Sequence, residues 1–358
     1  MKINRIILLF IFIVNLLCAQ TLIVEGGTKQ IEYDLEFLNQ IRFSQLDSLS
    51  NTALSFHTVT GIRHIRLSDI DAVEFNDTDE VLVHHMGLIS HFRQADINYI
   101  DISPVTLPDR PEGARSGSKF MEDILGTTFQ QREPYILTEF LNGNIPDILR
   151  DFITLTSTFK DVNGTNHTVE YDVMTDYLSI GTNEDYCRIP MGPSTAQKIA
   201  DAYGCILTTT KLCDDIWQHA TVHLDPIPYY PVADNNSQVY KFIEHNTDIN
   251  AAREMAGGTI HELIAGIKKD VVICNAVKTK PGYVAIYGWH YTSGTAIQPL
   301  YTGHVDWYVD YSHGIRLVNN IVRVDGVPMN AETILRDSIL YKLLSDENGI
   351  MRLPRYRY

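Results

Sequence analysis

The chain has 358 residues, of which 44% are hydrophobic and 20% charged, the composition of an ordinary globular protein. The formal net charge of −15 argues against general nucleic-acid binding and against docking on anionic membranes, because both need clustered Lys and Arg. The length leaves room for one large domain and one small one.

The N-terminus has the pattern of a secretory signal peptide. Lys2 and Arg5 give it a positive start, residues 6–17 are almost wholly apolar, and Ala19 supplies a small residue at the end. The apolar run is too short to span a bilayer. We therefore expect residues 1–19 to be a signal peptide, the mature chain to have no integral membrane segment, and export to the periplasm, the cell surface or the medium.

Two stretches that follow the signal repeat each other. Residues 22–43 and 54–75 align without a gap and share apolar positions: Leu22/Leu54, Tyr33/Ile65, Leu35/Leu67, Leu38/Ile70, Ile41/Val73 and Phe43/Phe75. Each copy has an early turn signal followed by the alternation of a half-buried strand. This pattern resembles the short hairpin repeats near the start of many secreted bacterial proteins, which implies a structural module. We expect residues 20–78 to form a two-copy β-hairpin module.

The rest of the chain mixes helical and strand patterns without a regular alternation. Residues 79–118 are predicted to be a linker with one helix at 81–92, and residues 119–358 a single globular domain. Further helices are expected at 119–126, 133–152 (in two pieces), 196–203, 211–220, 238–255 and 331–344. Strands are expected at 152–159, 168–173, 176–180, 271–274, 283–287, 305–311 and 315–324. The sequence therefore predicts an α+β fold, with a small all-β N-terminal module before a larger mixed domain.

The densest group of chemically active side chains lies in residues 288–316. It contains His290, His304 and His313, with Asp310 between the last two. Neutral imidazoles and a carboxylate are ligands that Zn²⁺ favours, and bound zinc lowers the pKa of its water. Along a strand, His304, Asp306 and Asp310 would share a face, and a bend at residues 312–314 would be needed to bring His313 to it. We therefore predict His290, His304, Asp310 and His313 as candidate zinc ligands, against the alternative of ordinary surface and core histidines.

The same segment predicts an exported hydrolase that acts on cell-wall or extracellular peptide or glycan. His290 and His313 are the candidate acid–base residues, and Arg316 or Lys268 would orient an anionic group of the substrate. For Lys268 the alternative is a solvated turn before an apolar strand.

A second enzymatic route would use a cysteine nucleophile. His290 followed by Asp306 resembles the His-then-Asp order of papain-like and transglutaminase-like enzymes, whose cysteine begins a helix. The cysteines beyond the signal do not match that context: Cys187, Cys205, Cys213 and Cys274. Their even number permits two disulfides in an exported chain and requires none.

Arg188 precedes a helix start at Ser194–Thr195. The arginine and the free backbone N–H groups at the helix start could bind an anion, and the alternative is ordinary helix capping.

The segment 312–316, SHGIR, resembles the SHGC motif of L,D-transpeptidases, but Ile315 stands where that family keeps its nucleophilic cysteine. That activity is therefore not expected.

A non-enzymatic function is the alternative to the hydrolase. Trp289, Tyr301, Trp307, Tyr308 and Tyr311 supply aromatic side chains of the kind that bind sugars and peptides. In that case the chain would be a secreted binding or surface protein.

The larger domain also resembles an uncharacterised secreted bacterial protein family. The resemblance rests on the phrases NGNIPD, YLSIGTNEDYCRIPM, GIKKDVV, YGWH and AIQPLY. It implies export and brings no site residues with it.

Overall fold

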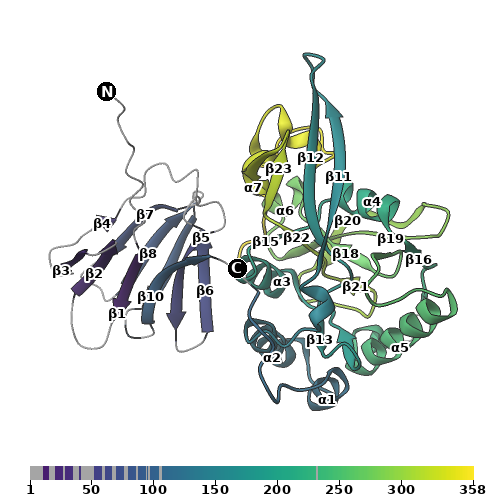
Figure 1. Cartoon of the computed structure of the whole chain (residues 1–358). Helices are drawn as coiled ribbons and strands as arrows, with labels where there is room; N and C mark the ends of the chain where they lie inside the picture. The colour runs from purple at the N-terminus through teal and green to yellow at the C-terminus, as the bar shows by residue number, and fades with distance from the viewer. Residues whose placement is uncertain are drawn as a thin grey trace. The chain divides into compact units, whose positions relative to one another are not determined.

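The structure is a computed structural model, shown in Figure 1, that describes residues 107–230 and 233–358 and, before them, strands between Ile11 and Pro104. The chain forms two compact units, residues 1–106 and residues 107–358. The first is built from strands and the second mixes helices and strands, which confirms the predicted α+β fold with an all-β N-terminal module.

The first unit contains two antiparallel sheets. Its strands are β1 (Ile11–Asn15), β2 (Thr21–Gly26), β3 (Lys29–Asp34), β4 (Gln40–Ile41), β5 (Thr52–Thr58), β6 (Gly61–Arg66), β7 (Ile70–Phe75), β8 (Glu80–His85), β9 (Leu88–Arg93) and β10 (Ile97–Pro104). One sheet has the order β3-β2-β1-β10-β5-β6 and the other the order β4-β7-β8-β9. The two predicted repeat copies correspond to β2–β4 and β5–β7, each a hairpin followed by a third strand.

The strands β8, β9 and β10 are a third copy of the same repeat. Strand β8 begins 28 residues after β5, and strands β9 and β10 each begin 27 residues after their counterparts, β6 and β7. At this offset the two copies are identical at several positions: His57/His84, Ile62/Ile89, His64/His91, Arg66/Arg93, Asp69/Asp96 and Ile70/Ile97. The repeat therefore runs past residue 78 and occupies most of the segment that we expected to be linker.

The predicted helix at residues 81–92 is wrong. The segment forms the antiparallel pair β8 and β9, in which Val81 faces Phe92 and Val83 faces Ser90. Val81 and Val83 are fully buried while Leu82 and His84 between them are only half-buried, which is the alternation of a strand. β-Branched side chains at alternate positions favour this pairing over a helix.

The second unit packs helices around two larger sheets. Its helices are α1 (Gly117–Asp123), α2 (Phe129–Leu141), α3 (Pro193–Ala202), α4 (Thr210–His219), α5 (Val239–Met255), α6 (Asn275–Thr279) and α7 (Ala331–Arg336), with 3₁₀ turns η4 (Asp147–Leu149), η5 (Ala233–Ser237) and η6 (Leu340–Leu343). Its strands are β11 (Phe152–Lys160), β12 (Asn166–Met174), β13 (Ser179–Gly181), β14 (Tyr186–Arg188), β15 (Cys205–Leu207), β16 (Val222–His223), β17 (Ile264–Ala265), β18 (Lys269–Val271), β19 (Tyr283–His290), β20 (Ala296–Val305), β21 (His313–Gly314), β22 (Leu317–Asn319), β23 (Ile321–Val324) and β24 (Val327–Asn330).

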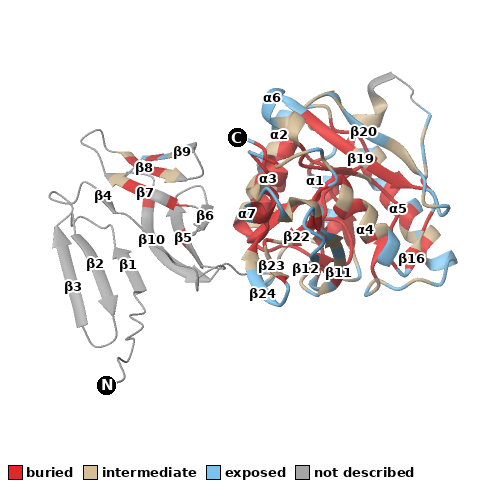
Figure 2. Cartoon of the chain, turned by 90° about the horizontal axis from the view of Figure 1, so that it is seen from above, coloured by how far each residue is buried: buried red, intermediate tan, exposed pale blue. Residues whose placement is uncertain are grey.

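The two larger sheets carry the core of this unit. One has the order β15-β22-β12-β23-β24 with β11 added to β12, and the other the order β20-β19-β18-β21. Figure 2 shows the buried residues concentrated in the sheets and on the inner faces of the helices. Fully buried apolar side chains from both sheets, such as Val173 and Ile286, belong to one hydrophobic cluster with α2 and α3. Apolar burial of this extent is the main stabilising term for the unit.

Several predicted elements of this unit are wrong in their extent. Residues 306–312 are a turn and an irregular segment, where we predicted the strand 305–311. The C-terminal helix ends at Arg336, and Asp337 after it accepts from the backbone N–H groups of Ile339 and Leu340, which begin a separate 3₁₀ turn. Helix α3 begins one turn earlier than expected, with Gly192 as its N-cap and Pro193 in its first turn.

Strand β18 lies in the middle of the sheet that carries the histidine segment. Lys269 pairs with Gly288 of β19 on one side and with His313 of β21 on the other. Strand β19 changes register near Gly288, where φ is 96°, and Trp289 follows with φ of 55°. This left-handed step, which is costly for a residue with a Cβ, lies directly before His290 at the end of β19.

In the described part of the chain, the helices are all too short or too polar to cross a membrane. The expected signal peptide at residues 1–19 lies largely outside the described residues and stays a prediction.

Candidate functional site

The structure brings three of the predicted residues together at one end of the sheet β20-β19-β18-β21. The ring centroids of His304 and His313 are 6.4 Å apart, and Nε2 of His313 lies 4.0 Å from Oδ1 of Asp310. His304 comes from the end of β20, and His313 comes from β21, which pairs with β18. The irregular segment between them brings Asp310 back toward both rings. We call His304, Asp310 and His313 the histidine centre.

A series of aromatic contacts connects this centre to the surface. Tyr301, which is 45% exposed, contacts His304 edge-on at 5.0 Å between centroids. His304 stacks on Tyr308 at 4.5 Å, and Tyr308 contacts His313 edge-on at 6.2 Å. His313 itself is only 1% exposed. The rings therefore pass from solvent to a buried imidazole in three steps.

His313 is held in its neutral form. Burial lowers its pKa to about 4, and the positive charges of Lys269 and Lys268 act in the same direction against the opposing charge of Asp310. Within the described residues, neither of its ring nitrogens has a hydrogen-bond partner. A buried polar atom without a partner costs free energy, so its presence is typical of a site that receives a ligand or a proton.

Asp310 is a carboxylate fixed by its neighbours. Burial alone would raise its pKa, but His313, Lys269 and two hydrogen bonds from Ser312 keep the pKa below its usual value. Ser312 donates its backbone N–H at 2.8 Å and its hydroxyl at 2.5 Å, both to Oδ1. Asp310 is therefore ionised and oriented at neutral pH, beside an imidazole that it would stabilise on protonation.

Lys268 is wholly buried, which contradicts the solvated turn that was the alternative for this residue. Its Nζ donates to Nδ1 of His245 at 3.0 Å and to the carbonyl oxygen of Tyr311 at 2.5 Å. Burial and, after it, the charge of Arg188 lower the pKa of Lys268 to about 7. The lysine is therefore close to half-protonated at neutral pH, on the core side of the histidine centre.

His290 belongs to a different group of residues. Its Nε2 lies 2.9 Å from Oδ1 of Asp214 in α4, and the Tyr287 hydroxyl donates to the same carboxylate at 2.9 Å. The ring of Trp217 lies 6.0 Å away. The structure therefore places His290 with α4, apart from His304 and His313.

Arg316 is buried in the core and is occupied with backbone groups. It donates to the carbonyl oxygens of Met174 at 2.8 Å and Ile264 at 2.6 Å. Its guanidinium carbon lies 4.3 Å from the ring centroid of Tyr177. These contacts join three segments of the fold and leave Arg316 with a structural role.

The described residues contain neither a group of metal ligands nor a cysteine suited to be a nucleophile. Among the residues that the structure describes, no three His, Cys, Asp or Glu side chains are grouped so that they could hold one metal ion. The zinc hypothesis stays a prediction, and no step proposed below uses a metal. The described cysteines are free and buried, and burial raises the pKa of Cys187 to about 12, which opposes a thiolate nucleophile.

His245 is a member of this region that the sequence analysis missed. It is fully buried in α5, and burial together with Lys268 holds its pKa well below the usual value. It contacts Tyr311 edge-on at 4.8 Å. A single histidine in a helix gives no signal in the sequence, because its relation to Lys268 depends on how α5 packs.

Comparisons of the chain with protein-family models, with curated proteins and with solved structures find no match.

Proposed function

We propose that this chain is an exported hydrolase that acts on peptide or glycan of the cell wall, with the histidine centre as its acid–base group. The observation that supports the proposal is the line of rings from exposed Tyr301 to buried His313, whose nitrogens have no hydrogen-bond partner in the described residues. A neutral imidazole beside an ionised carboxylate has the properties of a general base.

The roles follow from the positions of the groups. His304, the more exposed imidazole, would take a proton from a water molecule that attacks the substrate, and would return that proton to the leaving group. Asp310 would stabilise the resulting positive charge, and His313, whose Nε2 lies 4.0 Å from the Asp310 carboxylate, would hold that carboxylate in position. Burial, with the positive charges of Lys269 and Lys268 acting in the same direction, keeps His313 unprotonated before the reaction.

The test uses release of soluble fragments from dye-labelled bacterial cell wall. We expect His304→Ala and His313→Gln each to lower the rate about 100-fold or more, the usual size of a general acid–base contribution. His261→Ala is the matched control, because His261 is an exposed histidine outside the centre. Unchanged rates in both variants, with folding verified by circular dichroism, would exclude this centre as catalytic.

A specific observation favours the binding function as the second candidate. Large apolar side chains are exposed on and beside the β19–β20 hairpin: Tyr283 at 40%, Leu300 at 42%, Tyr301 at 45% and Trp307 at 56%. Exposed aromatic side chains of this kind mark interaction surfaces. Cosedimentation with cell wall that is lost in Trp307→Ala, without any release of fragments by the unmodified protein, would favour this function over hydrolysis.

A further inference from the structure

A pocket of about 670 Å³ opens in the second unit, away from the three residues of the histidine centre. Its walls come from four segments: α5, the start of α1, residues 183–187 and residues 258–260. This volume is in the range of small-molecule sites in proteins.

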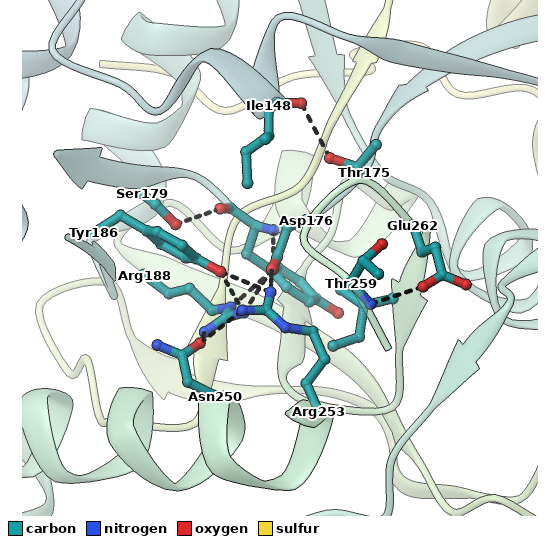
Figure 3. A network of polar contacts seen from close by, with 12 residues as sticks. Ile148, Thr175, Asp176, Ser179, Tyr186, Arg188, Asn250, Arg253, Thr259 and Glu262 are labelled. Atoms are coloured by element: carbon teal, nitrogen blue, oxygen red, sulfur yellow. Dashed lines mark hydrogen bonds and ion pairs between the residues drawn. The ribbon is translucent and has the colours of Figure 1, made fainter. Parts of the chain in front are cut away.

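Beside the lining residue Arg253 lies a buried cluster in which two guanidiniums share one carboxylate. Arg188 binds Asp176 through two hydrogen bonds, Nε to Oδ1 at 2.8 Å and Nη2 to Oδ2 at 2.6 Å. Arg253, which lines the pocket, reaches the same carboxylate at 3.7 Å, as Figure 3 shows. Burial would raise the pKa of Asp176, but Arg188 and Arg316 keep that pKa low, so the carboxylate is ionised. Its single negative charge lies against the guanidiniums of Arg188 and Arg253. A buried excess of positive charge is unfavourable unless an anion compensates it.

Three groups of the protein surround the Arg253 guanidinium, and one of them, the Tyr186 hydroxyl, keeps a proton to donate. The Tyr186 hydroxyl oxygen accepts from Nη1 of Arg253 at 2.7 Å, which leaves the hydroxyl proton to be donated. Oδ1 of Asn250 accepts from Arg188 at 2.9 Å and from Arg253 at 3.5 Å, so its amide nitrogen is turned to the other side. A guanidinium with a hydroxyl donor beside it matches the acceptors of a carboxylate.

The rim of the pocket is acidic. Glu254 follows Arg253 in α5 and is exposed, and Glu184 on the facing segment is exposed as well. The lining also includes the apolar side chains of Met121, Ile243 and Ile260. Carboxylates at the rim repel a phosphate dianion, which argues against a nucleotide or phosphate ligand.

We infer that this pocket binds a small zwitterion, a free amino acid or short peptide, with its carboxylate on Arg253 and Tyr186 and its ammonium group at Glu254 and Glu184. The apolar side chain of the ligand would contact Met121, Ile243 and Ile260. The inference uses none of the residues of the histidine centre and stands independently of the hydrolase proposal.

The test is isothermal titration calorimetry of the whole chain with three probes: glycyl-leucine, its C-terminal amide and its N-acetyl derivative. We expect saturable binding of glycyl-leucine, with affinity lowered about tenfold or more for the amide and several-fold for the acetyl derivative, because each loses one charge pair. These probes test the site without a variant of the buried arginines.

A variant at the rim provides the second measurement. Glu254→Gln changes an exposed residue, so we expect the fold to be kept and glycyl-leucine to bind nearly as weakly as its N-acetyl derivative. Glu112→Gln, exposed and outside the pocket, is the matched control and should leave all three affinities unchanged. Equal affinity for all three probes, or heat no different from dilution for glycyl-leucine, would overturn the inference.

Discussion

The burial of Lys268 should make the stability of the fold depend on pH. Its pKa is about 7 in the folded chain and 10.5 in an ordinary environment, so folding favours the neutral amine. Between these two values the unfolded state binds more protons than the folded state. Stability therefore rises with pH from about 7 to 10.5, and the cost of burying the charge is fully present below pH 7.

Replacing Lys268 by Met should remove this dependence. In urea unfolding between pH 7 and 10, we expect the stability difference between wild type and Lys268→Met to change by up to about 1.4 kcal/mol per pH unit, the limit for one titrating group. Lys278→Met, at an exposed lysine, should parallel the wild type. A difference that stays constant over this range would show that Lys268 is protonated throughout.

At the residue scale the sequence predicted the histidine centre for a partly wrong reason. The density of titratable groups in residues 288–316 led to His304, Asp310 and His313, but the expected alternation along a strand does not exist, since residues 306–312 are irregular. His290 was assigned to the same group because spacing alone cannot show the left-handed step at Gly288 and Trp289. Contacts such as Arg253 to Asp176, 77 positions apart in the sequence, depend wholly on tertiary packing.

At the scale of elements, tight backbone contacts hold the segments that form the pocket. Gly181, at the end of β13, has φ of 128°, and a Cβ there would lie 2.1 Å from the carbonyl oxygen of Asp185. Its backbone thereby fixes the turn that leads into β14 and the pocket wall. Only glycine combines this conformation with so close an approach.

Gly181→Ala should therefore destabilise the chain more than an alanine at another left-handed glycine. Gly164, with φ of 87°, is the matched control, because its added Cβ would have no neighbour closer than 3.8 Å. We expect about 1 kcal/mol of destabilisation for Gly164→Ala, from backbone strain alone. For Gly181→Ala we expect about 3 kcal/mol or more, because the Asp185 carbonyl would also have to move away from the new Cβ. Thermal unfolding measures both, and equal losses would contradict the role of the close contact.

Elements with strong local signals were predicted well, and those that depend on pairing were not. Helix α5 and the long pair β11 and β12 follow from periodicity and turn residues. The third repeat copy was missed because a short apolar run fits both helical and strand spacing, and the partner strand decides between them. Once β8 is aligned with β5, the repeat becomes visible in the sequence itself.

At the scale of the whole molecule, the second unit has a large hydrophobic cluster of its own. Among the described residues, the members of this cluster run from Phe120 to Tyr356. A unit that buries its own core can fold alone. The predicted α+β fold class is confirmed because it depends on which elements occur, while their pairing could not be predicted.

A shortened chain of residues 107–358 should therefore fold cooperatively. We expect one transition in differential scanning calorimetry, within a few degrees of the matching transition in the whole chain, since the described members of the cluster lie in this unit. The variant Ile286→Ala, which opens a cavity in that cluster, should lower the midpoint of both chains alike. A broad, non-cooperative transition of the shortened chain alone would show that the first unit completes the fold.

The position of β1 has a consequence for export. Strand β1, residues 11–15, lies between β2 and β10 in the middle of its sheet and also within the segment 1–19 that we predict to be cleaved. Cleavage would then remove the strand and leave β2 and β10 each with an open row of backbone N–H and C=O groups. The mature chain would either join these edges to each other or accept a strand from another polypeptide, so that maturation itself would control assembly.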